Sequence, residues 1–354
     1  MEKICVIFGG QSPEHDISRL SARSVIENLD KSKYDIYIVG ITKTGEWFLY
    51  TGDYKNITDG EWENDTENKK KAIISPDAKD RAIVVFDGND IKKIQPDVIF
   101  PVLHGEYGED GTVQGLFELS HIPYVGMGVM ASANGMDKTA SKIVFASAGI
   151  PQADWYVYNK GDDINAAVKS IEDKLGYPCF VKPARTGSSV GVGKAHNREK
   201  LISAIENAVK FDRKVLIEEN IDGHEVETAV LGNGGEIRVG EVGEIKPAVE
   251  FYDFDAKYSA DSETALEITA AIPDETREKI REYAKTAFCA LDGQGLSRVD
   301  FFVRYSDGSV VLNEINTMPG FTSISMYPKL FAAVGVDYPS LLDALINLAK
   351  ERVK

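Results

Sequence analysis

The sequence has few cysteines and lacks any long apolar run. Cys5, Cys179 and Cys289 lie far apart and without the paired spacing of zinc ligands, so we expect neither a disulfide framework nor a zinc site. No run of about 18 apolar residues occurs, and the opening MEKICVIFGG has neither the length nor the cleavage pattern of a signal peptide. We therefore expect a cytoplasmic protein that does not act on a membrane.

The chain also lacks an excess of positive charge. It has 40 basic and 56 acidic residues, a net charge of -16. This balance argues against nucleic acid or an anionic membrane as a partner, although a local basic cluster can still bind a phosphorylated small molecule. The 354 residues, 43% hydrophobic and 27% charged, are typical of a soluble enzyme with two or three domains.

Short apolar runs alternating with helical patterns predict an α/β fold. KICVIF at residues 3–8 is followed by two glycines, a helical pattern over residues 18–29, and the strand YDIYIVGIT, which is a β-α-β opening. The strand DVIFPVLHG continues this pattern. Residues 51–80 are polar with little periodicity, so we expect an irregular excursion there, with one hairpin at most and no visible chemistry.

The later part of the chain predicts two further units. YPCFVKPARTGSSVGVGKAHN has the strand, turn, strand rhythm of an antiparallel sheet, and a helix and the strand KVLIEEN follow it. From about residue 223, two strands, the helix DETREKIREYAKTAFCAL, a hairpin and a last helix form the third unit. We expect domains at 1–126, 127–222 and 223–354.

The hairpin LSRVDFFVRYSDGSVVLNEIN carries polar side chains at its end. A three-residue turn, Ser306–Gly308, is expected, with glycine supplying positive φ. This turn predicts three facing pairs: Tyr305 with Ser309, Asp300 with Glu314, and Arg298 with Asn316. Two opposed carboxylates repel unless protons or a cation lie between them. The face is therefore either solvated or a magnesium site that phosphates complete.

Two other stretches can be interpreted either as nucleotide-binding segments or as ordinary structural elements. Lys182 precedes the Gly/Ser turn of KPARTGSSVGVGK, which can wrap phosphate oxygens or simply close a hairpin. Glu218 and Glu219 end the strand VLIEEN and either receive an adenine amino group and a ribose or face solvent.

Loops of the first and third units carry further candidates. His104 and Glu109 follow an apolar strand, where ligands gather in α/β sheets, and we expect His104 to organise its loop by hydrogen bonding. Glu14 stands at a helix start, where acidic residues are common without any catalytic role. The aromatic and charged FYDFDAKY is either packed surface or a lid with Lys257 and Tyr258 at its tip.

Seven segments together carry a family resemblance. In order they are GGQSPEHDISRLSA, LHGEYGEDGTVQG, YVGMGVMASANGMDK, VKPARTGSSVGV, FYDFDAKY, LSRVDFF and NEINTMPGFTSIS. They closely resemble the signature segments of the D-alanine:D-alanine ligases, which are ATP-grasp enzymes, from near residue 4 to near 345. The resemblance implies a Rossmann-like N-terminal domain followed by two α+β domains that clasp ATP.

The resemblance also implies a nucleotide and metal site. Asp300, Glu314 and Asn316 match the ligands of two Mg²⁺ ions, which Mn²⁺ can replace. Lys138, Lys182 and the lid residue Lys257 match the lysines that contact the ATP phosphates. Four residues match the segment that holds adenine and ribose: Glu218, Glu219, Ile221 and Glu225.

The remaining matches concern the two D-alanine substrates. Glu14 matches the carboxylate that binds the first ammonium, and Ser188 links it to Tyr258. Arg298 and the Gly320 N–H match the groups that stabilise the tetrahedral oxyanion, and Ser325 matches the residue that takes the second carboxylate. The implied reaction passes through a D-alanyl phosphate.

The choice of second substrate rests on fewer residues. Tyr258 is present and Met326 follows Ser325, as in the D-alanine-specific branch, whereas relatives that use D-serine or D-lactate depart from this pattern. A dinucleotide oxidoreductase is disfavoured because GxGxxG spacing is absent, and a non-enzymatic nucleotide-binding regulator would need neither the metal ligands nor Arg298. The resemblance further implies a homodimer.

Overall fold

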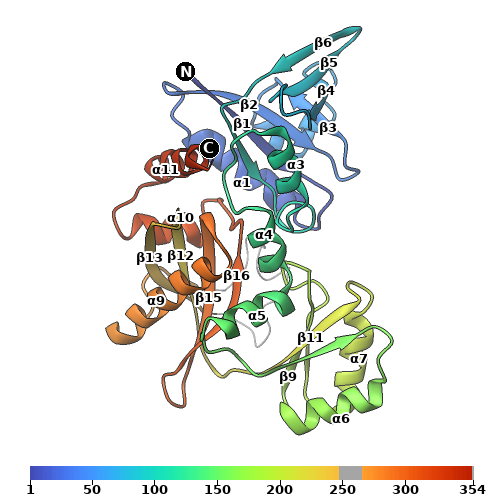
Figure 1. Cartoon of the computed structure of the whole chain (residues 1–354), viewed down its shortest axis with the longest axis vertical. Coiled ribbons are helices and arrows are strands. Elements are labelled where there is room, and N and C mark those ends of the chain that lie inside the picture. The colour runs from blue at the N-terminus through green and yellow to red at the C-terminus, as the bar shows by residue number, and fades with distance from the viewer. Residues whose placement is uncertain (247–264, 353–354) are drawn as a thin grey trace.

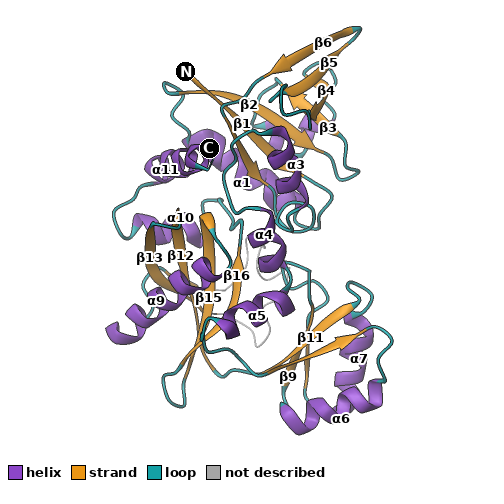
Figure 2. Cartoon of the chain, in the orientation of Figure 1, coloured by secondary structure: helices purple, strands orange, loops and turns teal. Residues whose placement is uncertain are grey.

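The computed structural model describes residues 1–246 and 265–352 and contains three sheets (Figure 1). The strand orders are β6-β5-β4-β3-β2-β1-β7, β10-β9-β11-β8 and β14-β13-β12-β15-β16. Helices pack against each sheet (Figure 2). Within the described residues, none of the helices combines the length and apolar character needed to cross a membrane.

The N-terminal sheet has the predicted β-α-β opening. Strand β1 (Glu2–Gly9) runs parallel to β2 (Tyr34–Ile41) and β7 (Val98–Val102), and helix α1 (His15–Asn28) joins β1 to β2. Six consecutive residues of β1 are buried, as expected for a strand covered on both faces. Helix α3 (Thr112–Ser120) follows β7. The carboxyl ends of β1 and β7 therefore deliver the Glu14 and Glu109 loops to one edge of the sheet.

Residues 51–80, predicted as an irregular excursion, belong to a regular extension of the sheet over residues 47–94. This extension contains strands β3 (Trp47–Tyr50), β4 (Lys69–Ile74), β5 (Ile83–Asp87) and β6 (Asp90–Ile94), with the short helices α2 (Asn56–Asp59) and η1 (Glu61–Glu63). These strands extend the sheet antiparallel from β2. Strands β3 and β5 read WFLY and IVVFD, so their sequences carried a strand signal that the prediction did not use.

The second sheet has the predicted antiparallel rhythm. Strand β9 (Cys179–Pro183) pairs with β10 (Gly193–Ala195) on one side and β11 (Lys214–Glu219) on the other, and β8 (Trp155–Asn159) completes it. Helices α6 (Ile164–Lys174) and α7 (Arg198–Ala208) pack on it, and their apolar residues share one core cluster with the strands. The helices α4 (Val129–Met136) and α5 (Lys138–Ser147) lead into this unit.

The third sheet contains the long strands β12 (Gly223–Asn233), β13 (Glu236–Lys246) and β15 (Gln294–Arg304), with β14 (Ala265–Glu267) and β16 (Val310–Asn316) at its edges. Helices α9 (Asp274–Ala290) and α10 (Met326–Ala332) pack against it. The last helix, α11 (Tyr338–Glu351), also contacts α1 and β7. One apolar cluster joins residues of α11, α10, β12 and the N-terminal sheet, so the two ends of the chain share a core (Figure 1).

The β15–β16 hairpin has the predicted facing pairs at its functional end but a different loop. Asp300 lies opposite Glu314, and Arg298 lies opposite Asn316. The predicted Tyr305–Ser309 pair is wrong: the Arg304 N–H donates to the Ser309 carbonyl at 3.0 Å, while the Tyr305 N–H donates to the Asp222 carbonyl at 3.0 Å.

The loop is therefore one residue longer than expected. A second offset compensates for it, because the register shifts between Asp300 and Phe301 and Asn313 becomes the extra residue of a β-bulge. The two single-residue offsets cancel and return Glu314 to the position opposite Asp300.

Candidate active site

A cavity of about 930 Å³ lies where the three sheets meet. Its lining includes all the predicted site residues that the structure describes: Glu14, Lys138, Lys182, Ser188, Glu218, Glu219, Ile221, Glu225, Arg298, Asp300, Glu314, Asn316, Gly320 and Ser325. These residues come from loops and strands of all three units and, for Lys138, from the start of helix α5. The predicted lid residues Lys257 and Tyr258, and therefore the predicted Ser188–Tyr258 link, lie outside the described residues.

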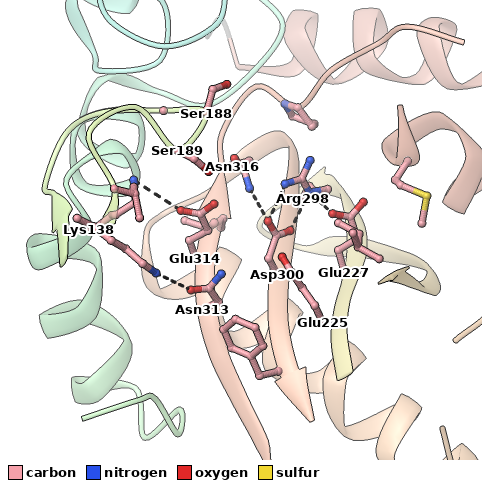
Figure 3. A pocket seen from close by; sticks show the side chains of 18 of the residues that line it. Lys138, Ser188, Ser189, Glu225, Glu227, Arg298, Asp300, Asn313, Glu314 and Asn316 are labelled. Atoms are coloured by element: carbon pink, nitrogen blue, oxygen red, sulfur yellow. Dashed lines mark hydrogen bonds and ion pairs between the residues drawn. The ribbon is translucent and has the colours of Figure 1, made fainter. Parts of the chain in front are cut away.

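The paired strands bring an acid pair and two cations together (Figure 3). Both Asp300 oxygens accept from Arg298, Oδ1 from Nε at 2.7 Å and Oδ2 from Nη2 at 2.6 Å, and Asn316 Nδ2 donates to Oδ2 at 3.0 Å. Glu314 Oε2 lies 3.6 Å from Lys138 Nζ. The positive charges offset the repulsion that the facing carboxylates would otherwise feel.

Arg298 is held by a second carboxylate that sequence reasoning missed. Glu227 Oε2 lies 2.9 Å from Arg298 Nε, and the Glu227 side chain is buried. Burial lowers the pKa of Arg298, but the charges of Asp300 and Glu227 outweigh it and hold that pKa well above the usual value. The guanidinium is therefore fixed in place and charged. Glu225 and Glu227 lie two residues apart in HEVE, and strand side chains two residues apart share a face. This spacing could have indicated that Glu227 lies on the same face as the predicted site residue Glu225.

A buried ion-pair cluster lies next to the cavity, with Glu218 and Lys182 in its lining and Lys142 outside it. Lys142 Nζ lies 2.6 Å from Glu218 Oε1, and Lys182 Nζ lies 2.8 Å from Glu218 Oε2. Burial raises the pKa of Glu218, but the charges of Lys182 and Lys142 lower it to about 2. The carboxylate therefore stays ionised. Lys142 was not predicted, although it lies one helical turn after Lys138.

The other residues predicted for adenine and ribose line the same cavity. Glu219 Oε1 accepts from Arg304 Nη2 at 2.7 Å and from the Asp154 N–H at 3.1 Å, so its carboxylate joins β11 to neighbouring segments. Ile221 and Glu225 follow on the turn into β12 and at its start, and both face the cavity.

Glu14 meets the Gly/Ser turn across a long sequence separation. The Ser188 hydroxyl donates to Glu14 Oε1. A Cβ placed on Gly187 would lie 2.5 Å from Glu14 Oε2, and one on Gly105 would lie 2.6 Å from the same atom. Glycine at these two positions is what allows both loops to close around the Glu14 carboxylate.

Glu109 joins the loop after β7 to the loop after β16. Its Oε1 accepts from the Gly105 N–H at 2.8 Å, and its Oε2 accepts from the Met318 N–H at 3.0 Å and the Thr317 hydroxyl at 3.3 Å. Burial and the nearby charge of Glu14 raise the pKa of Glu109 to about 8. Sequence reasoning named Glu109 but not this role, because nothing local indicates a partner more than 200 positions away.

His104 has the predicted hydrogen-bonding character, but its partners lie in α1 and in the loop after β16 rather than in its own loop. Its Nδ1 donates to the Met318 carbonyl at 2.9 Å, since a carbonyl can only accept, and its Nε2 lies 3.1 Å from the Ser21 hydroxyl. Burial lowers the pKa of His104. The histidine therefore acts here as a neutral hydrogen-bonding group rather than as a charge.

The loop after β16 also brings Gly320 against Ser325. A Cβ on Gly320 would lie 2.7 Å from the Ser325 hydroxyl, which in turn accepts from the Thr322 N–H at 3.0 Å. This compact turn holds a backbone N–H and a hydroxyl at the head of α10, on the same cavity as Arg298.

Two family models match the sequence. The D-ala D-ala ligase N-terminus model covers residues 3–127, and the D-ala D-ala ligase C-terminus model covers residues 144–347. A D-alanine–D-alanine ligase of Ruminiclostridium cellulolyticum is 51% identical and spans 99% of this chain and 96% of its own. Both halves of the chain therefore match the same family.

Solved structures give the same result. The VanG D-Ala:D-Ser ligase of Enterococcus faecalis is similar with a TM-score of 0.90 and 41% identity, over 98% of this chain and 99% of its own. The D-alanine-D-alanine ligase of Coxiella burnetii matches with a TM-score of 0.87 and 32% identity, over 99% and 94%. The motifs, the three-sheet architecture and these matches agree: the chain belongs to the D-alanine–D-alanine ligase family and has its ATP-grasp fold.

Proposed function

We propose that this protein joins two D-alanine molecules into D-alanyl-D-alanine while converting ATP to ADP and phosphate, for peptidoglycan precursor synthesis. The observation that carries the proposal is the meeting of Asp300, Glu314 and Asn316 with Lys138 and Lys182 at one cavity. Opposed acids, an amide and nearby ammonium groups are what a metal–triphosphate complex requires.

The donor set at the hairpin end fits magnesium. Asp300 and Glu314 offer hard carboxylate oxygens from facing strands, and Asn316 adds an amide. The described residues include no group of three or more His, Cys, Asp or Glu side chains that could hold a metal by themselves, so phosphate oxygens would complete the coordination. Two Mg²⁺ ions, or Mn²⁺ in their place, would neutralise phosphate charge during transfer.

The protein's own groups divide the remaining work. Glu14 would bind the ammonium of the first D-alanine, with Ser188 fixing the carboxylate. The first substrate's carboxylate would attack the γ-phosphate, held by Lys138, Lys182 and the lid residue Lys257, and the product would be an acyl phosphate and ADP. Glu218, Glu219, Ile221 and Glu225 would hold the adenosine.

The second half of the reaction would use the loop after β16. The amine of the second D-alanine, whose carboxylate Ser325 would bind, attacks the acyl phosphate carbonyl. Arg298 and the Gly320 N–H would stabilise the resulting oxyanion, each donor contributing about 3 to 4 kcal/mol by analogy with other oxyanion holes. Phosphate then leaves and the peptide bond remains. Tyr258 would connect the lid to the Glu14 site.

D-Ala-D-Ser ligation is a second candidate because VanG, a D-Ala:D-Ser ligase, is 41% identical to this chain. Met326 after Ser325 supports D-alanine as the second substrate instead. One pocket residue changes discrimination by only about 1 to 3 kcal/mol, so the choice between these substrates needs measurement. D-lactate as the second substrate is the remaining alternative.

The test is phosphate release from ATP and Mg²⁺ with D-alanine, L-alanine, and D-alanine paired with D-serine or D-lactate, with products identified by mass. We expect turnover with D-alanine alone and none with L-alanine. Turnover that requires D-serine or D-lactate would overturn the second-substrate assignment, and no phosphate release with any substrate would favour a nucleotide-binding regulator.

We further propose a homodimer that works in the cytoplasm, where ATP is available.

A further inference from the structure

Lys142 is a buried cation close to the nucleotide site, yet the proposed reaction gives it no task. Its side chain is 2% exposed, and it does not line the cavity, whereas its ion-pair partner Glu218 does. A buried ammonium is costly unless it is paired. Lys142 therefore acts through Glu218.

Helix α5 fixes Lys142 in this position. Lys138 and Lys142 lie four residues apart, so they share one face of the helix. The helix start is anchored, since the Lys138 N–H donates to the Ala184 carbonyl at 2.9 Å and the Asp137 side chain accepts from the Thr139 and Ala140 N–H groups. Gln152 Nε2 donates to the Lys142 carbonyl at 3.0 Å. The ammonium is thereby directed at β11 and Glu218.

The two lysines that contact Glu218 differ in what else they reach. Lys182 lines the cavity, and its Nζ also lies 3.4 Å from Asn313 Oδ1 beside the metal site. If the protein has the proposed function, Lys182 interacts with the phosphates of ATP as well as with Glu218. Lys142 does not line the cavity, and among the described residues its ion-pair partner is Glu218, so it acts on Glu218 without a share in phosphate binding.

The charge state of Glu218 decides which base the site accepts. An ionised carboxylate can only accept hydrogen bonds, so it pairs with the amino group at position 6 of adenine and repels the carbonyl oxygen at position 6 of hypoxanthine or guanine. A neutral carboxyl carries a proton and could donate to that carbonyl. Unpaired burial would favour the neutral form.

We propose that Lys142 is a positioning residue for base selection: its ammonium holds Glu218 as a fixed carboxylate that accepts from a 6-amino purine and rejects a 6-oxo purine. The inference rests on the proposed nucleotide site. It concerns recognition of the base only and leaves the chemistry at Asp300, Glu314 and Arg298 unchanged.

The test compares ATP with ITP, whose base, hypoxanthine, has a carbonyl at position 6 in place of the amino group of adenine. The variant is Lys142→Met, with Lys169→Met as the matched change at an exposed helical lysine. We expect the ratio of kcat/KM for ATP over ITP to fall at least about fivefold in Lys142→Met. The KM for D-alanine and kcat at saturating ATP should change less than about twofold, and Lys142→Arg should restore most of the ratio.

A calorimetric measurement of ATP and ITP binding, made without D-alanine, keeps the test independent of turnover. If Lys142→Met does not fold, Lys142→Gln keeps a polar donor toward Glu218 while it removes the positive charge, and we expect this variant to show the same loss of preference for ATP over ITP. An unchanged ATP-to-ITP ratio in a folded variant would overturn the inference. A wild-type protein that binds neither nucleotide would instead refute the proposed function.

Discussion

Asp300 on β15 lies directly opposite Glu314 on β16, although the hairpin loop between them is one residue longer than the sequence predicts. Asn313 supplies the compensating β-bulge, and its Oδ1 lies 3.4 Å from Lys182 Nζ. Bulges are common next to active sites because they redirect a side chain without ending the strand pairing. Here the bulge returns Glu314 to the acid pair and brings an amide to the neighbouring lysine.

Removing one charge of the acid pair should weaken metal binding. For Glu314→Gln, we expect the Mg²⁺ concentration for half-maximal phosphate release to rise at least about tenfold. We also expect kcat to fall about 100-fold, because the metal that would stabilise the phosphate charge loses a charged ligand. Glu236→Gln, at a side chain that is 85% exposed, is the control. A Mg²⁺ dependence equal to that of the wild type would contradict the assignment of Glu314 as a ligand.

Replacing the guanidinium at Arg298 by an ammonium should slow the chemistry more than it weakens binding. Arg298 is fixed by Asp300 and Glu227 through its planar fork, a geometry that lysine cannot reproduce. For Arg298→Lys we expect kcat to fall about 100-fold or more, with Arg213→Lys at an exposed position as the control. Steady-state kinetics in both D-alanine and ATP provides the measurement, and a kcat within about twofold of wild type would count against an oxyanion role.

Loss of the Glu109 carboxyl group should loosen the junction between the loops after β7 and β16. The N–H groups of Gly105 and Met318 would lose their acceptor, at roughly 1 to 3 kcal/mol for each buried donor left unpaired. We expect Glu109→Ala to lower the free energy of unfolding in urea by about 2 to 6 kcal/mol and to reduce kcat. Glu106→Ala changes an exposed carboxylate in the same loop and should leave both quantities nearly unchanged.

Acid should destabilise the protein partly through Glu218. Its pKa is lowered from 4.5 to about 2 in the folded state, so the unfolded chain binds this proton first as pH falls. The stabilisation is complete above about pH 5 and decreases toward pH 2, by about 2 kcal/mol between pH 5 and pH 3. Urea unfolding across this range should show a shallower pH dependence for Glu218→Gln than for wild type. Parallel curves would mean that the Glu218 pKa is not lowered.

The sequence by itself determined the elements and the residues that end them. The opening β-α-β unit and the antiparallel Gly/Ser hairpin follow from local periodicity and turn chemistry. The facing of Asp300 and Glu314 was predicted from a three-residue loop, and it holds because the longer loop and the bulge at Asn313 offset each other. The motif order then indicated the family. The domain boundaries and the individual catalytic roles remain predictions.

Only the tertiary structure decided how the loops at the ends of these strands and helices come together. The contacts of Glu14 with Ser188, of Glu109 with Met318 and of Lys142 with Glu218 join segments 76 to 209 positions apart, and no local pattern specifies such a partner. The packing of α11 on the N-terminal sheet is equally invisible locally. Burial of shared apolar faces positions these elements, and the loops they carry are thereby brought to a single cavity.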